Sequence, residues 1–230
     1  MAKLIVIEGS DGVGKATQSK LLAKKLRSLG FKVEIVSFPN YGTPGAKPLE
    51  MYLNGEFGSD PNIMNSYMAS MFFALDRLES YKHQYKMLFD SNDFIIADRY
   101  VESNLMYQGS KLDRGEQLVF ARWLFDLEYK INELPKPDYF FYLTMDADMS
   151  KELRSKRTGK TGGATGDIHE NNETYLQRAG ASWEYFKVMI EQYSTHNVYE
   201  IESTHNDKLL SKQEIHKEIM AGLQYMNALK

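Results

Sequence analysis

The chain has 230 residues, and its 28 Lys and Arg against 31 Asp and Glu give a formal net charge of −3. With 43% hydrophobic and 26% charged residues, this composition excludes collagen-like, low-complexity and disordered proteins. The balanced charge argues against a protein that coats nucleic acid or an anionic membrane, and we expect neither as a partner. The sequence contains no cysteine, which excludes disulfides, thiol nucleophiles and Cys-ligated metals.

The apolar run at the start of the sequence is too short for a signal peptide. Residues 4–7 are apolar and Glu8 follows them, whereas a signal peptide needs about 7–15 apolar residues in a row. No stretch approaches the roughly 20 apolar residues of a membrane helix. We therefore expect a cytoplasmic protein with a single domain over residues 1–230.

Short apolar runs alternate with longer segments of helical periodicity along the whole chain. Strands are expected at 4–7, 33–36, 94–97, 139–143 and 198–201. Helices are expected at 15–29, 63–89, 118–131, 149–157, 174–193 and 213–229. This alternation predicts an α/β fold with a five-stranded parallel sheet and helices on both faces. Ligands of such sheets bind beyond the carboxyl ends of the strands.

A glycine-rich loop follows the first strand and opens the first helix, which is the context of a P-loop. Its backbone N–H groups and the helix N-terminus can cradle phosphate oxygens, and Lys15 can reach the β- and γ-phosphates. The strict pattern has Ser or Thr where this chain has Ala16, so direct ligation of a metal by a hydroxyl is not expected. The loop and the candidate ATP-binding residues are Gly9, Ser10, Asp11, Gly12, Val13, Gly14, Lys15, Ala16 and Thr17.

Asp98 and Arg99 end the third expected strand. A carboxylate at the end of an apolar run is typical of the metal side of a phosphate site, and the guanidinium beside it offers a fork of donors for phosphate. The alternative is a salt bridge at a strand end, which is common in α/β proteins. The P-loop next to it favours the functional interpretation.

Phe73 and Arg77 are four residues apart and share one face of an expected helix. Together an aromatic ring and a guanidinium could stack on and hydrogen-bond a planar base. The spacing alone favours the simpler alternative, a core aromatic residue with an exposed arginine.

Residues 158–166 contain four Gly, three Thr and one Lys, and cannot build a core. We expect them to be a mobile loop within a lid at about 154–172 that closes over phosphates. Basic residues precede the loop, among them Arg154 and Arg157, and the acidic segment 167–170 follows it. The alternative is a charged loop that is simply solvated.

These motifs together resemble the thymidylate kinase family of the bacterial kind, over essentially the whole chain. The resemblance includes the loop at 9–15, the Phe-Ala-Leu-Asp-Arg stretch at 73–77, the Asp-Arg-Tyr triplet at 98–100 and the lid. It implies a P-loop NTPase fold and direct in-line transfer of the ATP γ-phosphoryl group to dTMP. The products would be dTDP and ADP, in dTTP synthesis, with Mg²⁺ as cofactor and a homodimer as the assembly.

The resemblance also assigns roles to residues of this sequence. Phe73 would stack on thymine, Arg77 would bond its carbonyl edge, and Tyr107 would crowd the ribose 2′ position. The acceptor-binding residues would be Asp11, Phe38, Tyr41, Phe73, Arg77, Arg99, Ser103, Asn104, Tyr107 and Gln108. The catalytic residues would be Asp11, Lys15, Arg99, Arg154 and Arg157. Asp11, Asp98 and Glu170 would hold the metal through water.

The chain departs from the family pattern at three positions. Gly12 stands where some members carry Arg, Asn40 stands where many do, and Ala16 lacks the hydroxyl. Two other interpretations remain: a kinase of another nucleotide or nucleoside on the same fold, and a nucleotide-binding module without turnover. A GTPase is disfavoured because no guanine-reading Asn-Lys-x-Asp motif occurs. The apolar helix near residues 64–78 is the expected dimer face.

Overall fold

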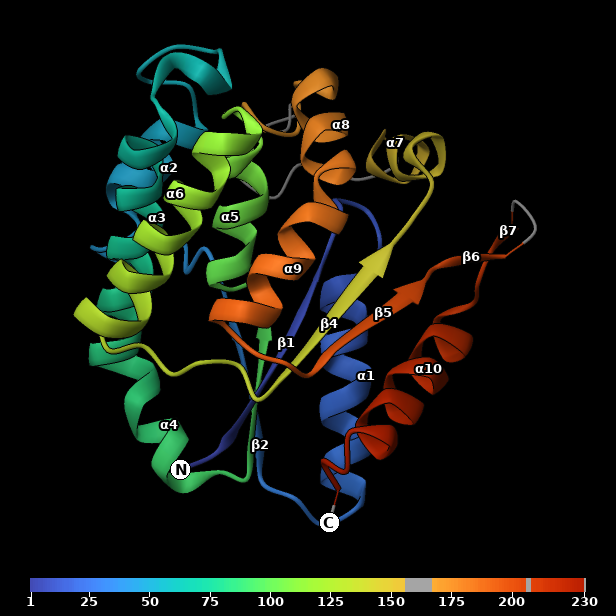
Figure 1. Cartoon of the computed structure of the whole chain (residues 1–230). Helices are drawn as coiled ribbons and strands as arrows, with labels where there is room; N and C mark the ends of the chain where they lie inside the picture. The colour runs from blue at the N-terminus through green and yellow to red at the C-terminus, as the bar shows by residue number, and fades with distance from the viewer. Residues whose placement is uncertain (156–166, 206–207, 230) are drawn as a thin grey trace.

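The computed structural model describes residues 1–155, 167–205 and 208–229, without the side chains of residues 147, 148, 154 and 155. Five parallel strands form the central sheet in the order β2-β3-β1-β4-β5 (Figure 1). They are β1 (Lys3–Gly9), β2 (Val33–Ser37), β3 (Phe94–Asp98), β4 (Tyr139–Thr144) and β5 (Val198–Glu202). The expected five-stranded parallel sheet is thus confirmed.

The central strand β1 is buried on both faces, as its continuous apolar run predicts. Leu4 and Val6 point into one hydrophobic cluster, while Ile5 and Ile7 point into the other. Helices α1 (Lys15–Ser28) and α10 (Lys212–Tyr225) cover the second cluster (Figure 1). The first cluster lies under α4 (Lys86–Ser91), α5 (Val101–Gly109), α6 (Arg114–Phe125) and α9 (Trp183–Tyr193).

Two expected helices are interrupted in the structure. The segment expected at 63–89 begins with the 3-10 turn η1 (Pro61–Ile63), continues as α3 (Ser66–Ser80), passes through the π-helical η2 (Tyr81–Tyr85) and ends as α4. Asn65 sets the start of α3, because its side chain accepts a hydrogen bond from the backbone N–H of Met68. The segment expected at 174–193 breaks at Ser182 into α8 (Glu173–Ala181) and α9.

Several elements were not expected. Helix α2 (Lys47–Leu53) has only seven residues with a proline in its first turn, and helix α5 mixes buried polar and apolar residues, so neither shows a clean apolar stripe. The expected helix at 118–131 starts earlier, as α6, and ends in the π-helical η3 (Asp126–Ile131). Strands β6 (Thr204–His205) and β7 (Lys208–Leu209) form a small antiparallel pair after β5. Helix α7 (Ala147–Ser155), by contrast, follows β4 where a helix was expected at 149–157. Among the described residues, no helix is both long and apolar enough to cross a membrane.

The sheet order brings the ends of β1 and β3 together. The two strands pair in parallel with Ile7 opposite Asp98, although the two residues are far apart in the sequence. The glycine-rich loop after β1 and the Asp98–Arg99 pair at the end of β3 therefore meet at one edge of the sheet.

Candidate active site

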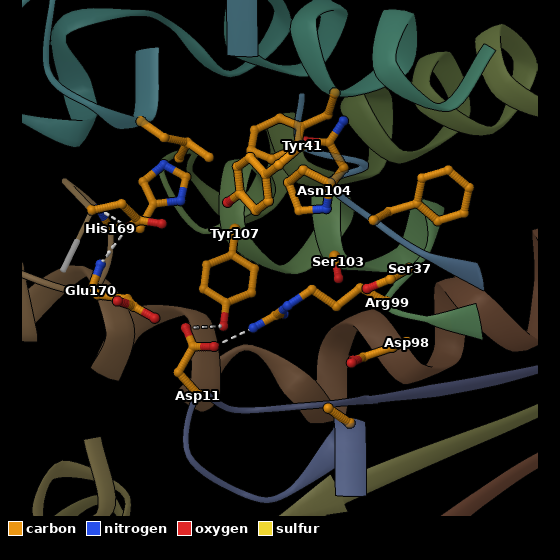
Figure 2. A pocket seen from close by; sticks show the side chains of 16 residues that line it. Asp11, Ser37, Tyr41, Asp98, Arg99, Ser103, Asn104, Tyr107, His169 and Glu170 are labelled. Carbon is orange, nitrogen blue, oxygen red and sulfur yellow. Dashed lines mark hydrogen bonds and ion pairs between the residues drawn. The ribbon is translucent and has the colours of Figure 1, made fainter. Parts of the chain in front are cut away.

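A cavity of about 370 Å³ lies at this edge of the sheet. It collects most of the residues that the sequence analysis assigned to acceptor binding, and Figure 2 shows their side chains turned toward one space. Eight of these ten residues line the cavity: Asp11, Phe38, Tyr41, Phe73, Arg99, Ser103, Asn104 and Tyr107. The expected metal-side residues Asp98 and Glu170 line it as well. The cavity is within the size range of small-molecule sites.

Arg77 and Gln108, the other two of these ten residues, are not among those that line this cavity. The Arg77 side chain is 2% exposed and ion-paired with Glu128, whose carboxylate accepts hydrogen bonds from Nε at 3.0 Å and from Nη2. Because a buried guanidinium needs a counter-charge, the arginine points to Glu128 rather than to the cavity. Gln108 is buried too, with Nε2 at 3.3 Å from the hydroxyl of Tyr175.

Arg99 is held between two carboxylates at the edge of the cavity. Its backbone is left-handed, with φ 68°, and its N–H donates to the carbonyl of Ile7 at 3.2 Å. Nη1 donates to Glu8 Oε1 at 3.0 Å, and Nη2 is ion-paired with Asp11 Oδ1. Burial opposes the positive charge, but Asp11, Tyr107, Glu8 and Asp98 together outweigh it, and the pKa of Arg99 is raised well above its usual value. The guanidinium also lies over the Tyr107 ring, 5.3 Å from its centroid (Figure 2).

Glu8 is a residue of this site that the sequence analysis missed. Its carboxylate is fully buried and accepts hydrogen bonds from Arg99, from the Ser103 hydroxyl and, at 2.9 Å, from the N–H of Gly9. Three donors satisfy the charge, so a carboxylate is stable here inside the protein. The signal was available: an acidic residue interrupts an otherwise apolar strand directly before the glycine-rich loop.

The glycine-rich loop has the form of a phosphate cradle. Gly12 and Gly14 adopt φ 98° and 99°, a region that side-chain-bearing residues rarely occupy, and α1 begins at Lys15. The buried Lys15 ammonium donates to the carbonyls of Gly9 at 2.8 Å and Ser10 at 2.9 Å. Burial lowers the pKa of Lys15 to about 8, and the nearby Arg99 adds to this effect. The loop amides and this lysine form a site suited to an anion.

His169 is a second residue that the sequence analysis missed. It lines the cavity, is 6% exposed, and its ring lies almost parallel to Tyr107 (6°, centroids 6.0 Å apart) and to Phe73 (22°, 6.2 Å). Burial, with the charge of Lys111 adding to it, lowers the pKa of His169 to about 3, so the imidazole is neutral. These rings come together only through tertiary packing, because Phe73, Tyr107 and His169 lie in three separate segments.

Asp167 orders the segment that carries His169 and Glu170. Its Oδ1 accepts from the backbone N–H groups of both residues, each at 2.9 Å, and burial raises the pKa of Asp167 to about 6. The lid expectation falls largely beyond the described residues. Arg157 lies in the stretch 156–166, and Arg154 is in α7 without a described side chain.

The donor set of the cavity fits Mg²⁺ only together with a ligand. Asp11, Asp98 and Glu170 line the same space, but within residues 1–155, 167–205 and 208–229 no cluster of three His or acidic residues could hold a metal ion by itself. Mg²⁺ commonly keeps several waters and binds one or two carboxylates plus substrate phosphates. Carboxylates beside a phosphate cradle match that pattern.

The family model for thymidylate kinase matches residues 7–218. A thymidylate kinase of Mycobacterium tuberculosis is 34% identical over 179 residues, which covers 77% of this chain and 82% of the relative. A probable thymidylate kinase of Methanosphaera stadtmanae is 30% identical over 221 residues, covering 96% and 98% of the two chains. The solved structure of thymidylate kinase from Candida albicans aligns with a TM-score of 0.69 at 24% identity, over 98% of this chain and 92% of that one, and shares the fold. The match to the family model and the identity to these relatives show that the chain belongs to the thymidylate kinase family, whose reaction is the phosphorylation of dTMP to dTDP.

Proposed function

We propose that this chain, acting as one domain over residues 1–230, transfers the γ-phosphoryl group of ATP directly and in line to the 5′-phosphate of dTMP. An oxygen of the acceptor phosphate forms the new bond to the γ-phosphorus. The bond from that phosphorus to the β–γ bridging oxygen breaks, and ADP leaves with the electron pair. The observation that carries this proposal is the position of Arg99, which lines the cavity and is ion-paired with Asp11 of the glycine-rich loop.

The acceptor would occupy the cavity with its base against Phe73 and Asn104. An aromatic ring gives a stacking surface, and the Asn104 amide, buried beside Ser70, offers an edge to a base. Phe38, Tyr41, Arg99 and Ser103 would surround the monophosphate. Arg77 is left out of this proposal because Nε and Nη2 donate to Glu128. Gln108 is left out because its Nε2 lies 3.3 Å from the hydroxyl of Tyr175.

The donor phosphates would bind the amides at 12–17 and the Lys15 ammonium. Two like unit charges 4 Å apart repel by about 4 kcal/mol at an effective dielectric constant of 20, so aligning two polyanions needs cations. Lys15 and Arg99 would offset this repulsion, together with Arg154 and Arg157. The role of the last two rests on the family resemblance alone.

Asp11, Asp98 and Glu170 would hold Mg²⁺ through water, as their shared cavity supports. When bound, the ion would neutralise negative charge on the phosphates. Ala16 lines the cavity and has no hydroxyl to offer, so the ion would depend on these carboxylates and on the phosphates.

The proposed assembly is a homodimer that packs α3 against its copy. Met68, Met71 and Leu75 share one side of α3 and are 52%, 59% and 44% exposed. Three neighbouring apolar side chains on one helix are a common mark of an interface. An enzyme that uses ATP and dTMP is expected in the cytoplasm, where both nucleotides occur.

The direct test measures ADP release by the purified chain with ATP and Mg²⁺ across dTMP, dUMP, dCMP, dGMP, AMP and thymidine. Preference for dTMP supports the reaction and the assignment of the cavity together. Turnover with another acceptor instead would keep the donor site and reject the proposed base pocket. ATP binding without turnover on any acceptor would favour a nucleotide-binding module, and Ala16→Ser would then be the first change to make.

A further inference from the structure

A polar chain of three side chains leads from Lys111, between α5 and α6, to the wall of the acceptor cavity. The Lys111 ammonium lies 3.1 Å from the hydroxyl of Tyr52, and that hydroxyl lies 3.1 Å from Nε2 of His169. Tyr52 is fully buried in α2, and His169 lines the cavity. Of these three residues, only His169 lines the cavity.

The Lys111 ammonium is fixed by neutral oxygens. Besides the Tyr52 hydroxyl it donates to the carbonyls of Pro61 at 2.6 Å and Met64 at 3.3 Å, which uses all three of its N–H bonds. It also lies 5.7 Å from the ring centroids of Tyr52 and Tyr175. The Lys111 ammonium therefore contacts α2, α8 and the segment 61–64 at the same time.

The Tyr52 hydroxyl is constrained by its neighbours. It accepts from Lys111, which has no lone pair to offer, and its own proton has the carbonyl of Pro61 at 2.8 Å and Nε2 of His169 as partners. The His169 imidazole thus meets a hydroxyl whose position is set from behind by a cation. The backbone supports the same arrangement, because the N–H of Ile168 donates to the carbonyl of Leu53 at the end of α2, at 3.0 Å.

We propose that Lys111 is a positioning residue for acceptor binding: through Tyr52 it orients the His169 imidazole, which forms one wall of the cavity beside Phe73 and Tyr107. His169 is then a specificity-determining residue that faces the nucleoside part of the acceptor. The proposal rests on the proposed function, since it assumes that the acceptor nucleotide binds in this cavity. It places the effect of Lys111 on acceptor affinity and not on phosphoryl transfer.

Two variants each remove one contact between the side chains of Lys111, Tyr52 and His169. Lys111→Met keeps most of the apolar stem and removes the ammonium, and Tyr52→Phe keeps the ring and removes the hydroxyl. Each is expected to raise KM for dTMP about tenfold, the usual scale for a lost hydrogen bond to a charged group. The kcat value and KM for ATP should stay within about twofold.

The matched control is Lys136→Met. Lys136 also donates to a backbone carbonyl, that of Tyr193 at 2.7 Å, and lies 5.6 Å from the ring centroid of Tyr129, but it does not line the cavity or contact His169. This variant should leave both KM values unchanged. The double variant Lys111→Met with Tyr52→Phe should raise KM for dTMP no more than either single variant, because both substitutions act on His169 through the same hydrogen bonds.

An additive double variant would overturn the proposal, as would Lys111→Met with unchanged KM for dTMP. The proposal would also be overturned if a variant changed kcat, KM for dTMP and KM for ATP to the same extent and lowered the melting temperature. That result would indicate a structural role alone.

A readout without activity completes the test. The imidazole ¹⁵N signals of His169, identified by their loss in His169→Gln, should shift in both Lys111→Met and Tyr52→Phe and not in Lys136→Met. Unchanged His169 signals would show that Lys111 does not act on His169 through Tyr52, and would refute the proposal. If the wild-type protein fails to phosphorylate dTMP, the proposed function fails, and these signals still decide whether Lys111 positions His169.

Discussion

Arg77 and Glu128 form an ion pair inside the molecule, with side chains 2% and 0% exposed. The pair joins α3 to η3. Burial opposes the charge on the guanidinium, but Glu128 outweighs it and raises the pKa of Arg77 above its ordinary value. The arginine of the stretch at 73–77 therefore holds α3 to η3, while Phe73 on the same helix forms part of the cavity wall.

Replacing Arg77 by Met should destabilise the fold. Removing one partner of a buried pair leaves the other charge uncompensated, and the free energy of unfolding should fall by about 3–5 kcal/mol. Urea unfolding followed by circular dichroism measures this change. The control is Arg122→Met, because Arg122 is exposed and donates to the hydroxyl of Tyr193. A stable Arg77→Met protein that has lost dTMP affinity would instead return Arg77 to the base pocket.

Replacing Arg99 by Ala should lower kcat by about 10²–10³-fold, the usual loss when a group that stabilises transition-state charge is removed. Some stability should be lost as well, because the fully buried Glu8 loses its cation. Turnover is therefore measured at a temperature where circular dichroism shows the variant folded. Wild-type kcat and kcat/KM in that folded variant would remove Arg99 from the mechanism.

Asp76 should make stability depend on pH. Burial raises the pKa of Asp76 to about 6, although the carboxylate accepts from the N–H of Asn40. A carboxyl with a raised pKa in the folded state adds stability that is complete below its unfolded value, near 3.8, and is lost as pH rises through about 6. The difference in unfolding free energy between wild type and Asp76→Asn should change by about 2–3 kcal/mol between pH 4 and 7. A constant difference over that range would contradict the shift.

Replacing Met71 by Glu should convert the proposed dimer into a monomer. A carboxylate at the centre of an apolar interface loses its hydration without gaining a partner. Light scattering coupled to size-exclusion chromatography gives the mass directly. Val188→Glu is the matched control, because Val188 is 60% exposed on α9, away from α3. A wild-type monomer, or a Met71→Glu dimer, would reject this face.

Replacing Tyr107 by Phe should weaken the preference for deoxyribose. The Tyr107 hydroxyl donates to Asp11 Oδ2 at 3.1 Å, which holds the ring over the cavity. Without the hydroxyl, the ring is released from Asp11 and a 2′-hydroxyl of the substrate meets less crowding. The ratio of kcat/KM for dTMP to that for ribothymidine monophosphate should fall about tenfold. An unchanged ratio would separate Tyr107 from sugar selection.

The sheet could be predicted from the sequence because its three inner strands, β1, β3 and β4, are short apolar runs that are buried on both faces. The helices were harder to predict. The apolar pattern at 63–89 runs through two helices and a π-helical turn, and periodicity alone does not mark these junctions. Helix α5 carries the buried polar residues Glu102, Asn104 and Gln108, so its pattern resembles neither an apolar stripe nor a loop.

The candidate site was predictable where its residues follow strands. Asp11 lies just after β1, and Asp98 and Arg99 lie at the end of β3, so the sheet brings them together. Partners that depend on tertiary packing were not predictable. Nothing in the local sequence pairs Arg77 with Glu128, 51 positions away, or brings His169 beside Tyr107.

The pairing of β1 with β3 has a consequence for how the protein gains its activity during folding. The Glu8–Arg99 contact closes a loop of 91 residues, and loops of this length form late and slowly compared with local helices. A chain whose helices have formed while these two strands are still apart would have a glycine-rich loop without its arginine. Recovery of turnover after dilution from denaturant should therefore lag behind recovery of helical signal, and should report the assembly of the central sheet.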